Sequence, residues 1–123
     1  MDTRSKILTL AEGASLAGPL AMVTGYFDIL RAAHIRDLEE LHGRVGGAKL
    51  LAVVLPERGE ILPQRARAEL VAALRVIDYV VIAEAAEADR LADSLNPVEI
   101  VRLEAADPRR ARELREHVHR RQS

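Results

Sequence analysis

The chain has 123 residues, 49% of them hydrophobic and 30% charged, a composition that predicts one globular domain over residues 1–123 and excludes a disordered chain. With 18 Lys and Arg against 19 Asp and Glu, and with two tyrosines, one phenylalanine and no tryptophan, it lacks the positive field and the stacking surfaces of nucleic-acid-binding proteins. It has no cysteine, and no apolar run approaches the ~20 residues of a membrane span, so we expect a cytoplasmic protein without disulfides, membrane contact or a nucleic-acid partner.

The first half of the chain predicts two buried strands and one helix. After a lead-in over residues 1–19, the apolar run at residues 20–24 predicts a strand, and the run at residues 49–55 predicts a second. Continuous apolar runs are typical of strands that are buried on both faces of a parallel sheet. Between them, apolar residues at spacings of three and four predict a helix over residues 34–44 that ends at a pair of glycines.

The second half of the chain repeats this alternation. Residues 63–76 predict a helix that begins at a proline, residues 79–83 a third buried strand, and residues 87–95 a further helix. Residues 98–103 alternate between apolar and polar side chains, which predicts a strand nearer an edge of the sheet. A last helix is expected over residues 107–123. Its arginines are typical of a solvated helix, and contact with an anionic partner is the alternative.

The order of these elements predicts a Rossmann-like three-layer α/β/α domain with a parallel sheet. Parallel strands need crossover connections, and these are right-handed almost without exception. We therefore expect the first predicted strand at the centre of the sheet, the second and third on one side of it and the fourth on the other. Ligands of such sheets bind at the carboxyl ends of the strands where the winding reverses, which is here the junction at residues 24–34.

Two sequence blocks carry a resemblance to a known family. Residues 23–41 read VTGYFDILRAAHIRDLEEL, and residues 62–81 read LPQRARAELVAALRVIDYVV. With the lead-in KILTLAE at residues 6–12, they resemble the cytidylyltransferase-like nucleotidyltransferases, in particular the nucleotidyltransferase domain of the ADP-heptose synthases and the glycerol-3-phosphate cytidylyltransferases. That superfamily has a G-x-F-D-x-x-H-x-G-H motif followed by a helix, and the resemblance covers about residues 6–103.

The resemblance implies an enzyme that transfers a nucleoside monophosphate from CTP or ATP to a sugar or polyol phosphate. It also implies Mg²⁺ bound with the nucleotide, a homodimer, and His34 and Arg31 as catalytic residues. The positions that it assigns to nucleotide binding are Thr24, Gly25, Tyr26, Phe27, Asp28, Ala33 and Arg67. Such a motif suits this chemistry because a helix amino-terminus and nearby imidazoles direct hydrogen-bond donors at phosphate groups.

The chain departs from the family motif at several positions. Arg31 stands where the family has its first histidine, and Ala33 stands where it has glycine. The lysines, Lys6 and Lys49, do not match the family's phosphate-binding lysine, and its Ser/Thr-rich phosphate-binding turn has no counterpart. Arginine keeps the positive charge but not the shape of an imidazole. We therefore predict a catalytically impaired domain that retains a phosphate or nucleotide site. The alternative is a non-catalytic structural or oligomerisation domain that binds no nucleotide.

The motif residues also have ordinary structural interpretations. Asp28 either orients a ligand or caps the turn before the helix, and Arg31 either holds a phosphate or lies on the surface. His34 either faces a phosphate or is a solvated or core histidine. The glycines at residues 43–47 follow a helix and precede a strand, the reverse of the dinucleotide-binding order, so they predict a turn. The histidine spacings do not predict a metal site within one helix.

Overall fold

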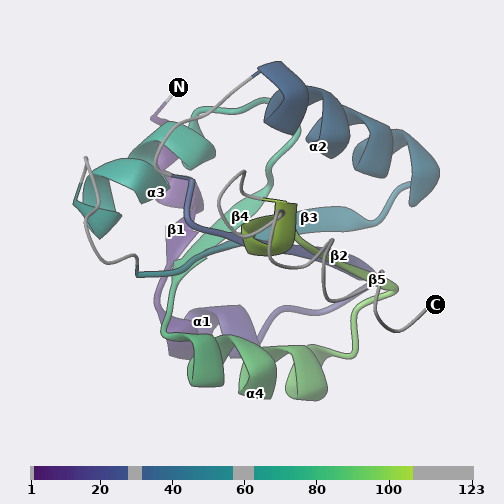
Figure 1. The fold of residues 1–123 in the computed structure, drawn as a ribbon. Coiled ribbons are helices and arrows are strands. Elements are labelled where there is room, and N and C mark those ends of the chain that lie inside the picture. Colours follow the sequence, from purple (N-terminus) through teal and green to yellow (C-terminus); the bar gives the residue numbers. More distant parts are fainter. Residues whose placement is uncertain (1, 28–31, 57–62, 107–123) are drawn as a thin grey trace, which may run out of the picture.

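The sheet of the computed structural model, which describes residues 2–27, 32–56 and 63–106, is parallel throughout (Figure 1). It has five strands in the order β1-β4-β3-β2-β5. The strands are β1 (Ile7–Leu8), β2 (Leu20–Gly25), β3 (Lys49–Val54), β4 (Tyr79–Ile82) and β5 (Glu99–Arg102). The predicted order of the four longer strands is confirmed. β1 extends the sheet beyond β4, so that β3, and not β2 as expected, is the middle strand.

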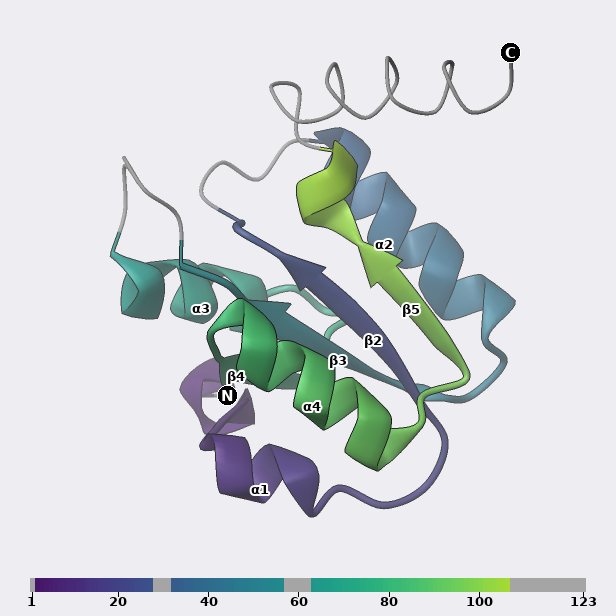
Figure 2. The same cartoon turned by 60° about the horizontal axis from the view of Figure 1, so that its bottom comes forward.

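Helices cover both faces of this sheet and make a three-layer structure. The helices α2 and α3 lie on one face, whereas α1 and α4 lie on the other (Figures 1 and 2). Their bounds are α1 (Leu10–Ala14), α2 (Ala32–Arg44), α3 (Gln64–Ala72) and α4 (Ala85–Leu95), with short 3₁₀ helices η1 (Thr3–Lys6) and η2 (Leu103–Ala106). The α/β architecture predicted from the order of elements is therefore confirmed.

Burial on both faces explains the apolar runs of the sequence. All six residues of β2 are buried, and so are the last five of β3. Along β2, Ala21 and Val23 pack with Leu38 of α2, while Met22 packs with Leu91 of α4 on the opposite face. Since each buried CH₂ group contributes about 0.8 kcal/mol, these two clusters supply most of the driving force that holds the layers together.

The region expected as a lead-in, residues 1–19, contains η1, β1 and α1. β1 escaped prediction because a strand of two residues shows no periodicity. α1 begins at a capping box, in which the backbone N–H of Thr9 donates to the Glu12 carboxylate over 2.8 Å and the backbone N–H of Glu12 donates to Thr9 Oγ1 over 3.1 Å.

The predicted helix bounds differ from the observed ones by a few residues. α3 ends at Ala72, four residues before the predicted end. α4 begins at Ala85, where the backbone N–H of Glu84 donates to the carboxylate of Glu87 in the first turn over 2.8 Å. It ends at Leu95, and the next residue, Asn96, has a left-handed φ of 48°. The helix expected over residues 107–123 lies outside the described residues.

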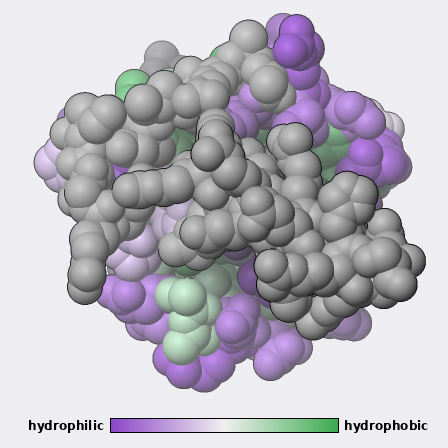
Figure 3. All heavy atoms as spheres, viewed as in Figure 1, coloured by the Kyte–Doolittle hydropathy of each residue, from purple (hydrophilic) through white to green (hydrophobic). Residues whose placement is uncertain are grey.

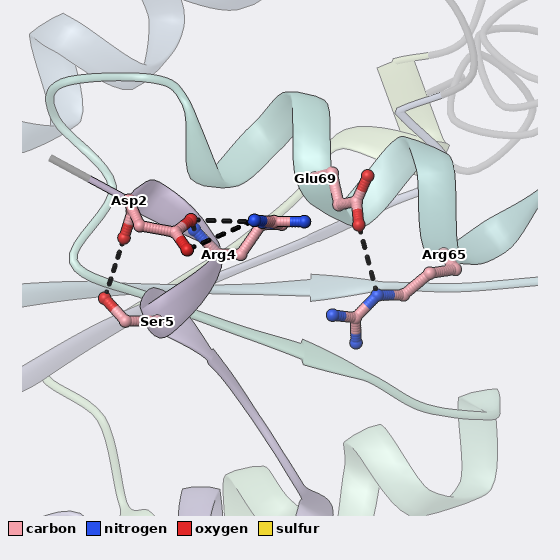
Figure 4. Close-up of polar contacts among 5 residues, drawn as sticks. All are labelled: Asp2, Arg4, Ser5, Arg65 and Glu69. Carbon is pink, nitrogen blue, oxygen red and sulfur yellow. Dashed lines mark hydrogen bonds and ion pairs between the residues drawn. The ribbon is translucent and has the colours of Figure 1, made fainter.

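The amino-terminal segment is attached to α3 by polar contacts. Lys6 Nζ donates to the backbone oxygens of Leu74 (3.2 Å) and Ile77 (2.7 Å), which follow α3. Figure 4 shows the neighbouring exposed ion pairs, Asp2 with Arg4 in η1 and Arg65 with Glu69 in α3. The hydrogen bonds from Arg4 hold the pKa of the Asp2 carboxyl below its usual value. Lys6 thus has a structural role at the edge of the sheet.

The outer faces of the helices are polar. In the view of Figure 3 the described surface is mainly hydrophilic, with small hydrophobic areas between charged side chains. Among the described residues, each helix is too short or too polar to span a lipid bilayer.

Candidate functional site

The carboxyl ends of β2, β3 and β5 lie level with one another. Gly25 at the end of β2 pairs with Val54 at the end of β3, and Thr24 pairs with Arg102 at the end of β5. The chain winds from β2 through β3 to β4 and then returns to β5 on the other side of β2, so the winding reverses at the β2–β5 pair (Figure 2). This is the place at which doubly wound sheets bind ligands, and the predicted junction at residues 24–34 begins there.

A tight turn follows β2. Phe27 has a φ of 54°, which is uncommon for a residue with a side chain, and its ring is buried beside α2 and α3. A methyl group on Gly25 would lie 3.2 Å from both Phe27 Cε2 and Leu103 Cβ, so only glycine fits there without displacing its neighbours. Tyr26 packs on the other face of the sheet, with the α1 and α4 cluster. Phe27 and Leu103 therefore close over the end of β2.

Arg67 is the buried cation of this edge. Its side chain is 0% exposed, and Nη1 donates to the backbone oxygens of Tyr26 and of Leu55, the latter over 2.8 Å. Gln64, at the start of the same helix, donates from Nε2 to the backbone oxygen of Val54 over 2.9 Å. α3 thus links the turn after β2 to the end of β3. Contact between Arg67 and a nucleotide stays a prediction.

The structure adds one acidic side chain that sequence reasoning missed. Glu104, in η2 directly after β5, accepts a hydrogen bond from Thr24 Oγ1, which lies 2.7 and 2.8 Å from its two carboxylate oxygens. Thr24 is 1% exposed, whereas Glu104 is partly exposed. The signal that could have found Glu104 is an acidic residue at the carboxyl end of a predicted strand, two positions past Arg102.

The remaining predicted site residues lie on the helix that follows the turn. His34 is in the first turn of α2 and is partly buried, and Ala33 precedes it in the same turn. Asp28 and Arg31 lie outside the described residues. Because α2 starts after β2, its first backbone N–H groups lie at the same edge as Thr24 and can hydrogen-bond an anion.

The donor set of this edge suits phosphate more than a protein-only metal site. Within residues 2–27, 32–56 and 63–106, no three His, Asp or Glu side chains gather closely enough to hold a metal ion. Magnesium in nucleotide sites, however, is commonly held by one or two carboxylates together with the phosphates of the ligand. Glu104 offers such a carboxylate, with a hydroxyl from Thr24 beside it.

Comparisons with known proteins place the fold. No protein-family model and no curated protein matches the chain. A crystal structure of the lipopolysaccharide core biosynthesis protein from Thermoplasma volcanium GSS1 is similar, with a TM-score of 0.59 and 26% sequence identity over 67% of this chain and 71% of that chain. The chain has a Rossmann-like α/β fold. Its likeness to a biosynthesis protein points to a nucleotidyltransferase-like fold, in agreement with the resemblance found in the sequence.

Proposed function

We propose that the chain is a nucleotidyltransferase-like domain that binds a nucleotide at the carboxyl end of β2 but has little or no transferase activity. The observation that carries the proposal is the position of Gly25 and Phe27 of the G-x-F-D motif, which lie at and just after the end of β2, where the winding of the sheet reverses. The similar biosynthesis protein supports a function in the same broad class. The proposed ligand is a nucleoside triphosphate, and the proposed location of the protein is the cytoplasm.

The proposed chemistry is an attack by a phosphate oxygen of a sugar or polyol phosphate on the α-phosphorus of CTP or ATP. The new P–O bond forms as the bond to pyrophosphate breaks, so the catalyst must position two anions and neutralise charge. Backbone N–H groups at the start of α2 and the His34 imidazole would donate to the phosphates. Mg²⁺ bound to the nucleotide would supply the further positive charge.

Impairment follows from the changed motif. Arg31 replaces an imidazole of the family pattern, and Ala33 adds a methyl group where the family has glycine. Loss of one charge-stabilising donor commonly lowers the rate by ~10²–10³, and several losses act together without multiplying fully. Phosphate binding depends on fewer groups and survives on a helix amino-terminus and an arginine.

Two measurements test this proposal. In a thermal-shift series, ATP, CTP or their Mg²⁺ complexes should raise the melting temperature of the chain, because a ligand that binds only the folded chain stabilises it. Pyrophosphate release should be slow with glycerol 3-phosphate or a heptose 1-phosphate as acceptor, and faster in the Arg31→His, Ala33→Gly double variant. Turnover by the unmodified chain within about tenfold of ~10 s⁻¹ would contradict the impairment.

A second candidate function is self-association without nucleotide binding. β5 is an edge strand. Val98, which precedes it, is 62% exposed and Ile100, within it, is 39% exposed, so two large apolar side chains meet solvent at this edge of the sheet. A homodimer would cover them. Light scattering at micromolar concentration should give twice the mass of the chain, and Ile100→Lys should give the monomer mass. A monomer for both chains would remove this candidate.

A further inference from the structure

Glu104 is an acidic side chain in an unexpected place. It lies at the end of the β2–β5 pair, where the proposed nucleotide would bring phosphate groups. A carboxylate beside a phosphate repels it, and in a partly buried site one unit of charge a few ångströms away changes an affinity by about tenfold. Glu104 therefore either opposes binding or takes part in it through a cation.

The hydrogen bonds that Glu104 accepts from described residues fill only part of its acceptor capacity. The Thr24 hydroxyl has one proton to donate, whereas a carboxylate has about four acceptor positions. Within the described part of the chain, Thr24 is the hydrogen-bond partner of Glu104, and no Lys or Arg pairs with it. By contrast, Glu99 at the other end of β5 lies 2.8 Å from Arg44 Nη2.

The local structure also fixes where this carboxylate can lie. Leu103, the preceding residue, is buried against Gly25, so η2 is attached to the end of β2 at two adjacent positions. Thr24 itself is 1% exposed, and its hydroxyl donates to Glu104. Thr24 is therefore a positioning residue, and the partly exposed carboxylate of Glu104 is the group that a ligand can reach.

On the basis of the proposed function, we propose that Glu104 makes this site selective for the magnesium complex of a nucleotide over the free nucleotide. A hard carboxylate oxygen is a suitable ligand for Mg²⁺, directly or through a coordinated water, when phosphates complete the coordination. With Mg²⁺ present the carboxylate attracts the complex, and without it the same charge repels the phosphates. Glu104 is then a specificity-determining residue.

The test is a set of calorimetric titrations of the full chain with ATP and with CTP, each in excess Mg²⁺ and in EDTA. The quantity of interest is the ratio of the two dissociation constants, free nucleotide over magnesium complex. We expect Glu104→Gln, which keeps the shape and the contact with Thr24, to lower this ratio by about tenfold. The matched control is Glu99→Gln, which removes the same charge at the opposite end of β5 and should leave the ratio unchanged.

Thr24 provides a second, independent comparison. Thr24→Val removes the hydroxyl at nearly constant volume and should lower the ratio, while Thr24→Ser keeps the hydroxyl and should restore it. A merely structural role of Thr24 would change the melting temperature but not the ratio, so both quantities are measured on each variant.

The outcomes separate the two proposals. If the unmodified chain binds nucleotide but the ratio is the same in Glu104→Gln, or falls equally in Glu99→Gln, the role of Glu104 is wrong and the proposed function stands. If the unmodified chain binds neither form of either nucleotide, the proposed function is wrong, and the role of Glu104 is wrong with it.

Discussion

Each end of the β2–β5 pair has one acidic side chain, and the two carboxylates have different hydrogen-bond partners. At the amino end, Glu99 forms an ion pair with Arg44 at the end of α2, and backbone hydrogen bonds continue past the strands, as from Val98 to Leu20 over 2.8 Å. At the carboxyl end, Glu104 accepts from the neutral hydroxyl of Thr24. Within residues 2–27, 32–56 and 63–106, the carboxylate is therefore paired with a cation at the amino end and with a neutral group at the carboxyl end.

The difference separates an end of the sheet where the carboxylate stabilises the fold from an end where it can contact a ligand. The hydrogen bonds that Arg44 donates to the Glu99 carboxylate raise the pKa of the Arg44 guanidinium, so that pair stabilises the fold in its charged form. At the carboxyl end, the buried cation Arg67 donates to backbone oxygens, whereas Glu104 accepts from Thr24. Among the described residues, the carboxyl end therefore combines the buried contacts of Arg67 with a surface carboxylate that no Lys or Arg pairs with, a combination suited to ligand binding.

The largest loss of stability is expected when the buried side chain of Arg67 is removed. Arg67→Ala removes the donors of the Tyr26 and Leu55 oxygens and leaves a cavity, which should lower the free energy of unfolding by about 3–5 kcal/mol. The control is Arg65→Ala, on the same helix, whose exposed ion pair with Glu69 should change stability by less than about 1 kcal/mol. Urea denaturation measures both, and equal losses would contradict the structural role of Arg67.

A glycine-to-alanine substitution should change the free energy of unfolding in opposite directions at the two ends. Gly25→Ala places a methyl group 3.2 Å from Phe27 and Leu103 and should destabilise the chain by about 1–3 kcal/mol. Gly43 lies near the end of α2, and a methyl group there would meet open space. Gly43→Ala should therefore stabilise the chain by up to about 1 kcal/mol, since alanine favours the helix. Thermal unfolding of both variants measures the signs, and two equal shifts would contradict the difference in packing.

A smaller effect is expected from the ion pair at the amino end. Glu99→Gln should lower the melting temperature slightly in dilute buffer, because it removes the carboxylate that pairs with Arg44. The difference should vanish in ~1 M salt, where the Debye length is ~3 Å. A loss that persists in high salt would show that packing, and not charge, fixes this end.

The smallest effect serves as a reference away from both ends. The hydrogen bonds from Thr9 hold the pKa of the Glu12 carboxyl below its usual value, so the unfolded chain binds this proton more readily than the folded chain. The contribution is therefore present above the usual pKa of a glutamate and is lost as the pH falls through the lower, folded-state value. Glu12→Gln should remove this part of the acid destabilisation, as thermal unfolding between neutral and acid pH would show. Identical pH profiles would contradict it.

The sequence predicts the sheet well because burial on both faces leaves a mark on each strand. The runs that became β2, β3 and β4 are continuous and apolar, and the weaker alternation of β5 matches its place at an edge. β1 could not be found this way, since two residues pair with β4 through backbone groups that every sequence has.

The candidate site was predicted less completely than the fold. Thr24 and Gly25 were found because they end a recognisable strand, but the contact of Thr24 with Glu104 joins residues 80 positions apart, and no local pattern encodes it. For Arg67, the sequence block indicates a nucleotide contact, whereas its complete burial is a property of how α3 meets the sheet. Side-chain partners of this kind depend on tertiary packing, which composition and periodicity do not specify.

The edge strand β1 bears on the order in which the chain can fold. Ile7 pairs with Val80 and Leu8 with Val81, so β1 has no strand to pair with until synthesis has passed β4. Pairings across such a sequence separation close large loops and form slowly. Until then β4 presents an open edge that a second unfinished chain could pair with. We therefore expect more aggregation during refolding when the residues before Thr9 are removed, which refolding kinetics with and without them would measure.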